Sequence, residues 1–277
     1  MRTLRLPGGE TVPVLGQGTW GMGEDPGSRG AEVAALRRGL ELGLSLIDTA
    51  EMYAEGGSEE VIAEAIRGRR DQVFLVSKVY PHNASAQGTL AACERSLRRL
   101  ATDRIDLYLL HWRGAHPLAE TVAAFERLQR AGKIRHWGVS NLDAEDMAEL
   151  AAVPGGAACA TDQVLYNPGR RGPEWDLLPW CRERGMPVMA YSPIEQGRLR
   201  TDGVLAEIGR EAGGTPFQVA LAWVLARPGV LAIPKASRLD HVEANAAALD
   251  LALTQDQLAR IDREFPPPKA KRSLAML

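Results

Sequence analysis

Short apolar segments alternate with segments of helical periodicity along the whole chain, and this alternation restricts the fold more than any other feature. The apolar segments lie at 14–17, 44–47, 73–77, 105–110, 134–139, 161–165, 187–191 and 230–233. Between them, apolar residues recur every three or four positions, as at Val33, Leu36 and Leu40. Strands that alternate with helices predict parallel β/α units, and eight such units close into a barrel. The sequence therefore predicts an α/β fold, a (β/α)8 TIM barrel.

The length fits one such barrel, which takes roughly 250 residues. The chain has 277 residues, so residues 1–277 are predicted to form a single domain. Two segments lie outside the repeat. Residues 4–13 carry Gly8 and Gly9 between alternating apolar residues, which predicts a β-hairpin. Thr254 and Gln257 have the spacing of a capping box, which predicts a helix that ends before Pro266.

Charge and apolar content exclude several classes of partner. The formal net charge is −2, which provides no basic surface for nucleic acid or for an anionic membrane. No apolar segment approaches the length of a membrane span, and the N-terminus lacks the apolar core of a signal peptide. We therefore expect a cytoplasmic protein without nucleic-acid or membrane partners, and we expect a monomer. Cys93 and Cys181 share helical faces with leucines, which favours packing in the core.

Four polar residues stand at or just past the ends of apolar strands. Asp48 and Tyr53 follow the second strand, Lys78 ends the third and His111 ends the fourth. The carboxyl ends of parallel barrel strands converge on one face, and residues placed there are typically catalytic. An acid, a phenol, an amine and an imidazole are therefore predicted to meet. Tyr53 is the candidate proton donor, because a neighbouring cation such as Lys78 lowers the pKa of a phenol.

Each of these residues also has a structural explanation when it is taken alone. An aspartate such as Asp48 often caps a turn, and Tyr53 can be a half-buried tyrosine with its hydroxyl in water. A lone His111 is usually a hydrogen-bonded histidine, and no second histidine or carboxylate lies at metal-ligand spacing. Lys78 is harder to explain, because lysine is rarely buried without a partner. The equivalent placement of all four favours a catalytic site without a metal.

Short motifs in a fixed order and spacing make this chain resemble the aldo-keto reductases. The motifs are LGQGTW at 15–20, DTA at 48–50 followed by Tyr53, SKV at 77–79, HW at 111–112, GVSN at 138–141, QVLYN at 163–167, YSP at 191–193 and IPKA at 233–236. The resemblance spans nearly the whole chain. It implies a catalytic tetrad in which Tyr53 is the general acid and His111 orients the carbonyl oxygen, while Asp48 holds Lys78.

The resemblance also implies two features of the barrel ends. The N-terminal hairpin is expected to cover the bottom of the barrel. A long C-terminal loop closes the substrate pocket in many members of the family, whereas the tail after Pro268 is short here. The pocket is therefore expected to be more open.

No glycine-rich dinucleotide fingerprint follows a strand in this sequence, so the barrel itself must hold a nicotinamide cofactor. Ser140, Asn141 and Gln163 end two strands with the donors and acceptors that a carboxamide needs. Loops after the seventh and eighth strands commonly bind phosphate. Lys235 and Arg238 in the last of these loops suit the second phosphate of NADPH, although Arg238 can also be an exposed residue at a helix start.

The resemblance implies NADPH as the cofactor. The expected cofactor-binding residues are Gly18, Thr19, Trp20, Asp48, Ser140, Asn141, Gln163, Tyr191, Ser192, Pro193, Ile194, Gln196, Arg198, Ile233, Pro234, Lys235, Ala236, Ser237, Arg238, His241 and Asn245. His241 and Ala244 differ from the arginine and glutamate that are often found in the family, which leaves the use of NADH open.

The predicted function is the NADPH-dependent reduction of aldehydes or ketones to alcohols by hydride transfer. The predicted substrate pocket consists of Trp20, Tyr53, Tyr80, His111 and Trp112. Two other functions stay open. A Schiff-base lyase would use Lys78 as its nucleophile, but a lysine paired with a carboxylate stays protonated. A non-catalytic barrel would only sense the cofactor, and an intact tetrad argues against it.

Overall fold

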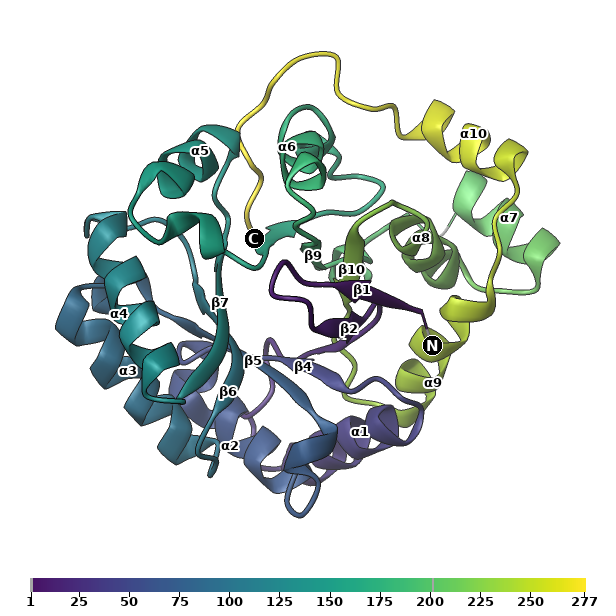
Figure 1. Cartoon of the computed structure of the whole chain (residues 1–277). Coiled ribbons are helices and arrows are strands. Elements are labelled where there is room, and N and C mark those ends of the chain that lie inside the picture. Colours follow the sequence, from purple (N-terminus) through teal and green to yellow (C-terminus); the bar gives the residue numbers. More distant parts are fainter. Residues whose placement is uncertain (1, 201) are drawn as a thin grey trace.

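Eight parallel strands form a closed barrel in the computed structural model, which describes residues 2–200 and 202–277 (Figure 1). The strands are β3 (Gln17–Gly18), β4 (Leu46–Asp48), β5 (Phe74–Val79), β6 (Ile105–Leu110), β7 (Ile134–Ser140), β8 (Asp162–Leu165), β9 (Val188–Tyr191) and β10 (Val230–Ile233). Each strand pairs with the next in chain order. Bridges from Leu15 to Ala232 and from Gly18 to Lys235 join the two ends of the sheet. The predicted TIM barrel is confirmed.

Helices surround the barrel (Figure 1). The α-helices of the described residues are α1 (Arg29–Glu41), α2 (Gly57–Ala65), α3 (Ala86–Arg99), α4 (Leu118–Arg130), α5 (Ala144–Ala152), α6 (Leu177–Glu183), α7 (Val204–Ala212), α8 (Pro216–Leu225), α9 (Leu239–Ala247) and α10 (Gln255–Glu264). Side chains of Ser85 and Asp143 cap α3 and α5, and Thr215 begins α8 with a capping box. The capping box predicted at Thr254 begins α10. None of these helices is both long and apolar enough to cross a membrane.

Apolar side chains fill the barrel interior up to the carboxyl ends of the strands. Leu46 on β4 and Val76 on β5 belong to this inner cluster and are fully buried. Successive side chains of a strand alternate between its two faces, so the residue two positions later also points inward. On β4 and β5 that residue is Asp48 and Lys78. The interior of the barrel therefore changes from apolar to polar at this end, where the site lies.

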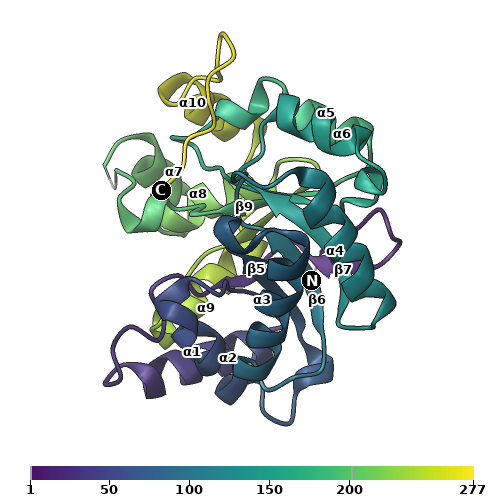
Figure 2. The ribbon, with the colours of Figure 1, turned by 90° about the vertical axis from the view of Figure 1, so that its left-hand side faces the viewer.

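The N-terminal hairpin closes the opposite end of the barrel. Its strands are β1 (Thr3–Arg5) and β2 (Thr11–Pro13), which pair antiparallel as predicted. Leu6 and Val12 pack into the inner cluster. Glu10 Oε2 lies 2.7 Å from His136 Nε2 near the start of β7. Figure 2 places the purple hairpin and the C-terminus at opposite ends of the barrel, so the hairpin leaves the carboxyl ends of the strands accessible.

The tail after α10 returns to the carboxyl ends of the barrel strands, where its last residues line the pocket. That the pocket is more open than in relatives with a long C-terminal loop stays a prediction. Lys271 Nζ lies 2.5 Å from Glu145 Oε1 and 3.5 Å from Asp176 Oδ2. Glu145 lies in the first turn of α5 and Asp176 directly precedes α6, so these carboxylates attach the basic tail to the barrel. Met276 and Leu277 line the cavity described below. A short tail therefore still covers part of the pocket, because ion pairs direct it inward.

Candidate active site

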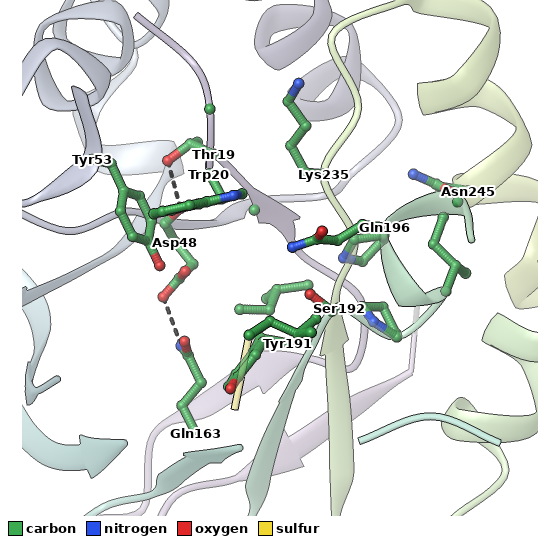
Figure 3. Close-up of a pocket in the computed structure, with 18 of the residues that line it drawn as sticks. Thr19, Trp20, Asp48, Tyr53, Gln163, Tyr191, Ser192, Gln196, Lys235 and Asn245 are labelled. Atoms are coloured by element: carbon green, nitrogen blue, oxygen red, sulfur yellow. Dashed lines mark hydrogen bonds between the residues drawn. The ribbon is translucent and has the colours of Figure 1, made fainter. Parts of the chain in front are cut away.

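The carboxyl ends of the strands surround a cavity of about 870 Å³ (Figure 3). Most of the residues predicted for the site line it: Gly18, Thr19, Trp20, Asp48, Tyr53, His111, Trp112, Ser140, Asn141, Gln163, Tyr191, Ser192, Pro193, Ile194, Gln196, Ile233, Pro234, Lys235, His241 and Asn245. Lys78 is fully buried and contacts two of these residues from behind the wall. The predicted catalytic residues and most of the predicted cofactor-binding residues thus meet at one cavity.

A chain of hydrogen bonds joins Asp48, Lys78 and Tyr53. The Lys78 ammonium donates to Asp48 Oδ2 at 2.8 Å and to the Tyr53 hydroxyl at 3.1 Å. Its third hydrogen bond goes to the Thr49 carbonyl at 2.8 Å. Gln163 Nε2 donates to the other Asp48 oxygen at 2.7 Å (Figure 3). All three N–H donors of the Lys78 ammonium therefore bind protein oxygens. These bonds fix Lys78, Asp48 and Tyr53 relative to one another.

Burial and charge together set the protonation of this group. Burial alone would lower the pKa of Lys78, but Asp48 and Tyr53 raise it above its ordinary value, so the ammonium persists at neutral pH. Burial raises the pKa of Tyr53, and the charge of Lys78 offsets only part of that rise. The expected effect of Lys78 is present, but the net shift of the Tyr53 pKa is upward. Tyr53 therefore keeps its proton at neutral pH, as a proton donor must.

His111 lies beside Tyr53 on the cavity wall. The centroid of its ring is 5.7 Å from that of Tyr53 and 4.8 Å from that of Trp112. Burial lowers the pKa of His111 well below its ordinary value, and the charge of Lys78 adds to this effect. The imidazole is therefore neutral at neutral pH. A neutral ring can donate a hydrogen bond to a carbonyl oxygen without competing with Tyr53 as the acid.

Aromatic rings form the wall next to Tyr53. Trp20 packs edge-on against Tyr53 with 5.0 Å between ring centroids, and half of its surface is exposed. Trp112 also lines the cavity. Tyr80, which was also predicted for the substrate pocket, does not line this cavity. Its ring packs instead against Trp112 and His82, at centroid distances of 5.1 and 4.2 Å.

The turn after β7 places hydroxyl and amide groups at the cavity wall. Asn141 has a φ of +60°, a conformation that asparagine tolerates better than most residues. Its side chain donates to the His111 carbonyl at 3.2 Å and accepts from the Tyr191 hydroxyl at 3.1 Å. Ser140 Oγ donates to the Gln163 carbonyl at 2.8 Å. These hydrogen bonds link residues at the ends of β6, β7, β8 and β9. The groups predicted to bind a carboxamide therefore lie next to one another.

Lys235 and Asn245 line the cavity away from Tyr53 (Figure 3). They come from the segment after β10 and from α9, and Lys235 brings a positive charge to this end. His241, on the same helix, also lines the wall.

Four residues predicted to bind the cofactor do not line the cavity: Arg198, Ala236, Ser237 and Arg238. Arg238 forms two hydrogen bonds with Asp240, at 3.0 and 2.7 Å, and its side chain is 68% exposed. Arg198 donates to Gln196. Both arginines therefore have partners at the rim, and their role in phosphate binding stays a prediction.

Further residues line the cavity that sequence reasoning did not assign to it: Gly21, Glu24, Met52, Gly197, Thr215, Phe217, Gln218, Ala244, Met276 and Leu277. Thr215 and Gln218 form the capping box of α8, a spacing that can be read from the sequence. Glu24 and Met52 belong to loops that carry no such signal. Met276 and Leu277 reach the wall through the fold of the tail, which no local pattern encodes.

Known proteins share this sequence and fold. The sequence model of the Aldo/keto reductase family matches residues 14–264. The methylglyoxal reductase YeaE of Escherichia coli is 56% identical over 281 aligned positions, which cover 100% of this chain and 99% of that protein. A glyoxal reductase of Bacillus subtilis is 33% identical and is matched over 94% of this chain and 91% of that protein.

A solved structure agrees with these relatives. The crystal structure of an aldo-keto reductase from Klebsiella pneumoniae in complex with NADPH is 56% identical to this chain. The two structures superimpose with a TM-score of 0.95 over 100% of this chain and 99% of that chain. The chain therefore belongs to the aldo/keto reductase family.

Proposed function

We propose that this chain reduces small aldehydes and ketones, in particular α-dicarbonyl compounds such as methylglyoxal, with Tyr53 as the proton donor. The reaction class follows from the family: the chain is an NADPH-dependent carbonyl reductase. One observation supports Tyr53 as the acid. Its hydroxyl lies at the cavity wall, 3.1 Å from the buried ammonium of Lys78.

The cavity suits a nicotinamide dinucleotide in size and chemistry. Its volume of about 870 Å³ lies within the usual range of ligand pockets, about 300–1,000 Å³. Ser140, Asn141 and Gln163 supply hydroxyl and amide groups for a carboxamide, and the Tyr191 ring lies beside them. Lys235 supplies a cation for phosphate. When it is bound, NADPH supplies the hydride that reduces the carbonyl carbon.

The residues of the chain hold and move the proton. Lys78 donates a hydrogen bond to the Tyr53 oxygen, so the hydrogen of Tyr53 is free to point to a carbonyl oxygen in the cavity. Its transfer leaves a phenolate, which the Lys78 ammonium stabilises. Asp48 balances the charge of that ammonium, and neutral His111 offers a second hydrogen bond to the carbonyl oxygen. A proton from solvent then restores the Tyr53 hydroxyl.

The relatives and the pocket wall support small carbonyl compounds as substrates. The Escherichia coli and Bacillus subtilis relatives are a methylglyoxal reductase and a glyoxal reductase. Trp20 packs against Tyr53, and Met52, Trp112 and Met276 also line the cavity. These side chains offer few partners for hydroxyl groups, so the site selects the carbonyl group and disfavours hydroxyl-rich sugars.

A panel of carbonyl compounds tests this assignment. With NADPH present, methylglyoxal and glyoxal should be reduced with a higher kcat/KM than a hydroxyl-rich aldose of similar reactivity, as followed by the loss of NADPH absorbance. Quenching of tryptophan fluorescence measures NADPH binding in the same samples. Binding of NADPH without turnover of any carbonyl compound would favour a cofactor sensor instead.

The environment of Lys78 argues against a Schiff-base lyase. A nucleophilic amine must be neutral and accessible, whereas Lys78 is fully buried and its pKa is raised by Asp48 and Tyr53. All three of its donors are engaged within the protein. Attack on a carbonyl carbon would require Lys78 to lose its proton and at least one of these partners.

Replacing Lys235 should weaken NADPH binding much more than NADH binding. Lys235 lines the cavity, and its ammonium lies 3.3 Å from Ser237 Oγ at the exposed rim, where a second phosphate can reach it. The loss of a charge-assisted contact costs about 1.5–3 kcal/mol, or roughly tenfold to over a hundredfold in affinity. Lys235→Met should show this loss for NADPH, measured by fluorescence titration of both cofactors.

Arg238→Ala should show a smaller loss for NADPH, because Arg238 must first leave Asp240 to reach the phosphate. Asp240→Asn is the matched variant: it frees Arg238 and should tighten NADPH binding if that arginine takes part. Equal losses for NADH and NADPH in Lys235→Met would remove Lys235 from the phosphate site. If neither Arg238→Ala nor Asp240→Asn changed NADPH binding, Arg238 would not belong to the phosphate site.

A further inference from the structure

Glu51 lies between Asp48 and Tyr53 in the sequence and connects the loop after β4, which carries Tyr53, to the segment that follows Lys78 after β5. Its Oε1 accepts hydrogen bonds from the Tyr80 backbone N–H at 2.8 Å and from Asn83 Nδ2 at 3.0 Å. Its Oε2 accepts from Arg95 of α3 at 3.2 Å. The Glu51 side chain is only 8% exposed. Oε1 therefore joins Glu51 to the segment after β5, and Oε2 joins it to α3.

The hydrogen bonds of Glu51 Oε1 lie close in sequence to the catalytic residues. Asp48 ends β4 and Tyr53 lies in the loop after it, on either side of Glu51, while Lys78 lies in β5 and Tyr80 directly follows that strand. The bond from Glu51 to the Tyr80 N–H thus joins the two loops a few residues from the Lys78 contacts. A shift of one loop against the other would change the distance of 3.1 Å between Lys78 Nζ and the Tyr53 hydroxyl.

The same contact also supports the aromatic wall. The Tyr80 ring packs against Trp112 at 5.1 Å between centroids, and Trp112 packs against His111 at 4.8 Å. Tyr80 itself does not line the cavity. Its backbone is held by Glu51 and its ring touches Trp112, so Glu51 reaches the substrate wall through Tyr80.

We propose that Glu51 is a positioning residue for carbonyl reduction, which holds the loops after β4 and β5 in register so that Tyr53, Lys78 and Trp112 keep their places. The proposal rests on the proposed role of Tyr53 as the acid. Oε1 performs the task, because it accepts the two hydrogen bonds from the segment that carries Tyr80. Arg95 binds Oε2 from α3, so its pair with Glu51 does not join the two loops, and the Arg95 side chain is 39% exposed.

Four variants separate these contributions. Glu51→Ala removes all side-chain contacts and keeps the hydrogen bond from the Glu51 backbone N–H to the Lys78 carbonyl at 3.4 Å. Glu51→Gln keeps one carbonyl oxygen that can accept from both Tyr80 and Asn83, and it loses the ion pair with Arg95. Arg95→Gln removes the ion pair alone. Asn83→Ala removes one of the two donors to Oε1.

Glu51→Ala should lower kcat/KM for methylglyoxal by roughly tenfold to a hundredfold, because small displacements of catalytic groups have effects of this size. The Kd for NADPH should not change, since no contact of Glu51 involves the residues assigned to the cofactor. Glu51→Gln should recover most of the loss, and Arg95→Gln should behave as wild type. Asn83→Ala should show a smaller loss of the same kind, which keeps the test valid if Glu51→Ala does not fold.

Steady-state kinetics well below each variant's Tm, with NADPH titrations, decide the matter. Wild-type kcat/KM in folded Glu51→Ala and in Asn83→Ala would overturn the proposal, and so would an equal loss in Arg95→Gln. A purely structural role would lower the Tm of Glu51→Ala without changing the kinetics of the folded enzyme. Tyr53→Phe, measured in parallel, separates the two claims: an active Tyr53→Phe contradicts the proposed function, whereas an inactive Tyr53→Phe beside a fully active Glu51→Ala contradicts only this inference.

Discussion

Tyr53→Phe should lower kcat for carbonyl reduction by at least about a hundredfold, the usual minimum for the loss of a positioned general acid. Phenylalanine keeps the ring that packs against Trp20 and His111, so the cavity wall and the affinity for NADPH should change little. Only the hydroxyl that Lys78 contacts is removed. Stopped-flow or steady-state assays with methylglyoxal measure the loss, and fluorescence titration measures NADPH binding.

Tyr108→Phe is the matched control. Tyr108 is a fully buried tyrosine on β6 that lies outside the cavity wall, so the loss of its hydroxyl should leave turnover intact. A Tyr53→Phe enzyme that turns over at a near-wild-type rate would contradict the assignment of Tyr53 as the acid. A loss shared equally by both variants would point to a general effect of removing a buried hydroxyl.

The pH dependence of the wild-type enzyme follows from the same residue. An acid works only while it is protonated, and burial raises the pKa of Tyr53 above its ordinary value near 10. The kcat/KM for reduction should therefore stay level through neutral and mildly alkaline pH and fall only as the pH passes the raised pKa. This alkaline decline should be absent from the residual activity of Tyr53→Phe.

The barrel and the centre of the site could be predicted because both depend on local patterns. Short apolar strands and helical periodicity specify the β/α units. The period of two along a strand then brings Asp48, two positions after Leu46, to the same inner face at the polar end. Lys78 follows Val76 in the same way. A polar residue that ends an apolar strand is therefore a strong signal in this fold.

The remaining features depend on contacts between distant segments. Tyr80 follows a strand end as Trp112 does, yet packing against Trp112 keeps it away from the cavity wall. The tail reaches the pocket because Lys271 meets carboxylates more than ninety residues away, such as Glu145. The net pKa shift of Tyr53 depends on how completely its surroundings bury it. None of these quantities is encoded by neighbouring residues in the sequence.

Lys78→Met should nearly abolish turnover and also destabilise the protein. Methionine keeps much of the side-chain volume but removes the charge that stabilises the Tyr53 phenolate and pairs with Asp48. Breaking one side of a buried ion pair typically costs about 3–5 kcal/mol, because the remaining charge stays buried without a partner. Kinetics with methylglyoxal and denaturant unfolding should show both effects.

The stability loss of Lys78→Met should depend on pH in a defined direction. Without Lys78, burial is the dominant influence on Asp48, and burial already raises its pKa in the wild-type protein. A carboxyl group whose pKa is higher in the folded state favours folding at low pH and opposes it as the pH rises. The loss in free energy of unfolding that Lys78→Met causes should therefore be smaller at mildly acidic pH than at alkaline pH.

A double variant, Lys78→Met with Asp48→Asn, distinguishes the catalytic role of Lys78 from its structural role. Removing both charges should restore much of the stability, because no uncompensated charge is left in the barrel. It should not restore turnover, because the Tyr53 phenolate still lacks its cation. Full recovery of activity in the double variant would show that Lys78 only neutralises Asp48. Rescue of Lys78→Met by an added primary amine, with an adduct between the amine and the substrate trapped by borohydride, would instead support the Schiff-base lyase.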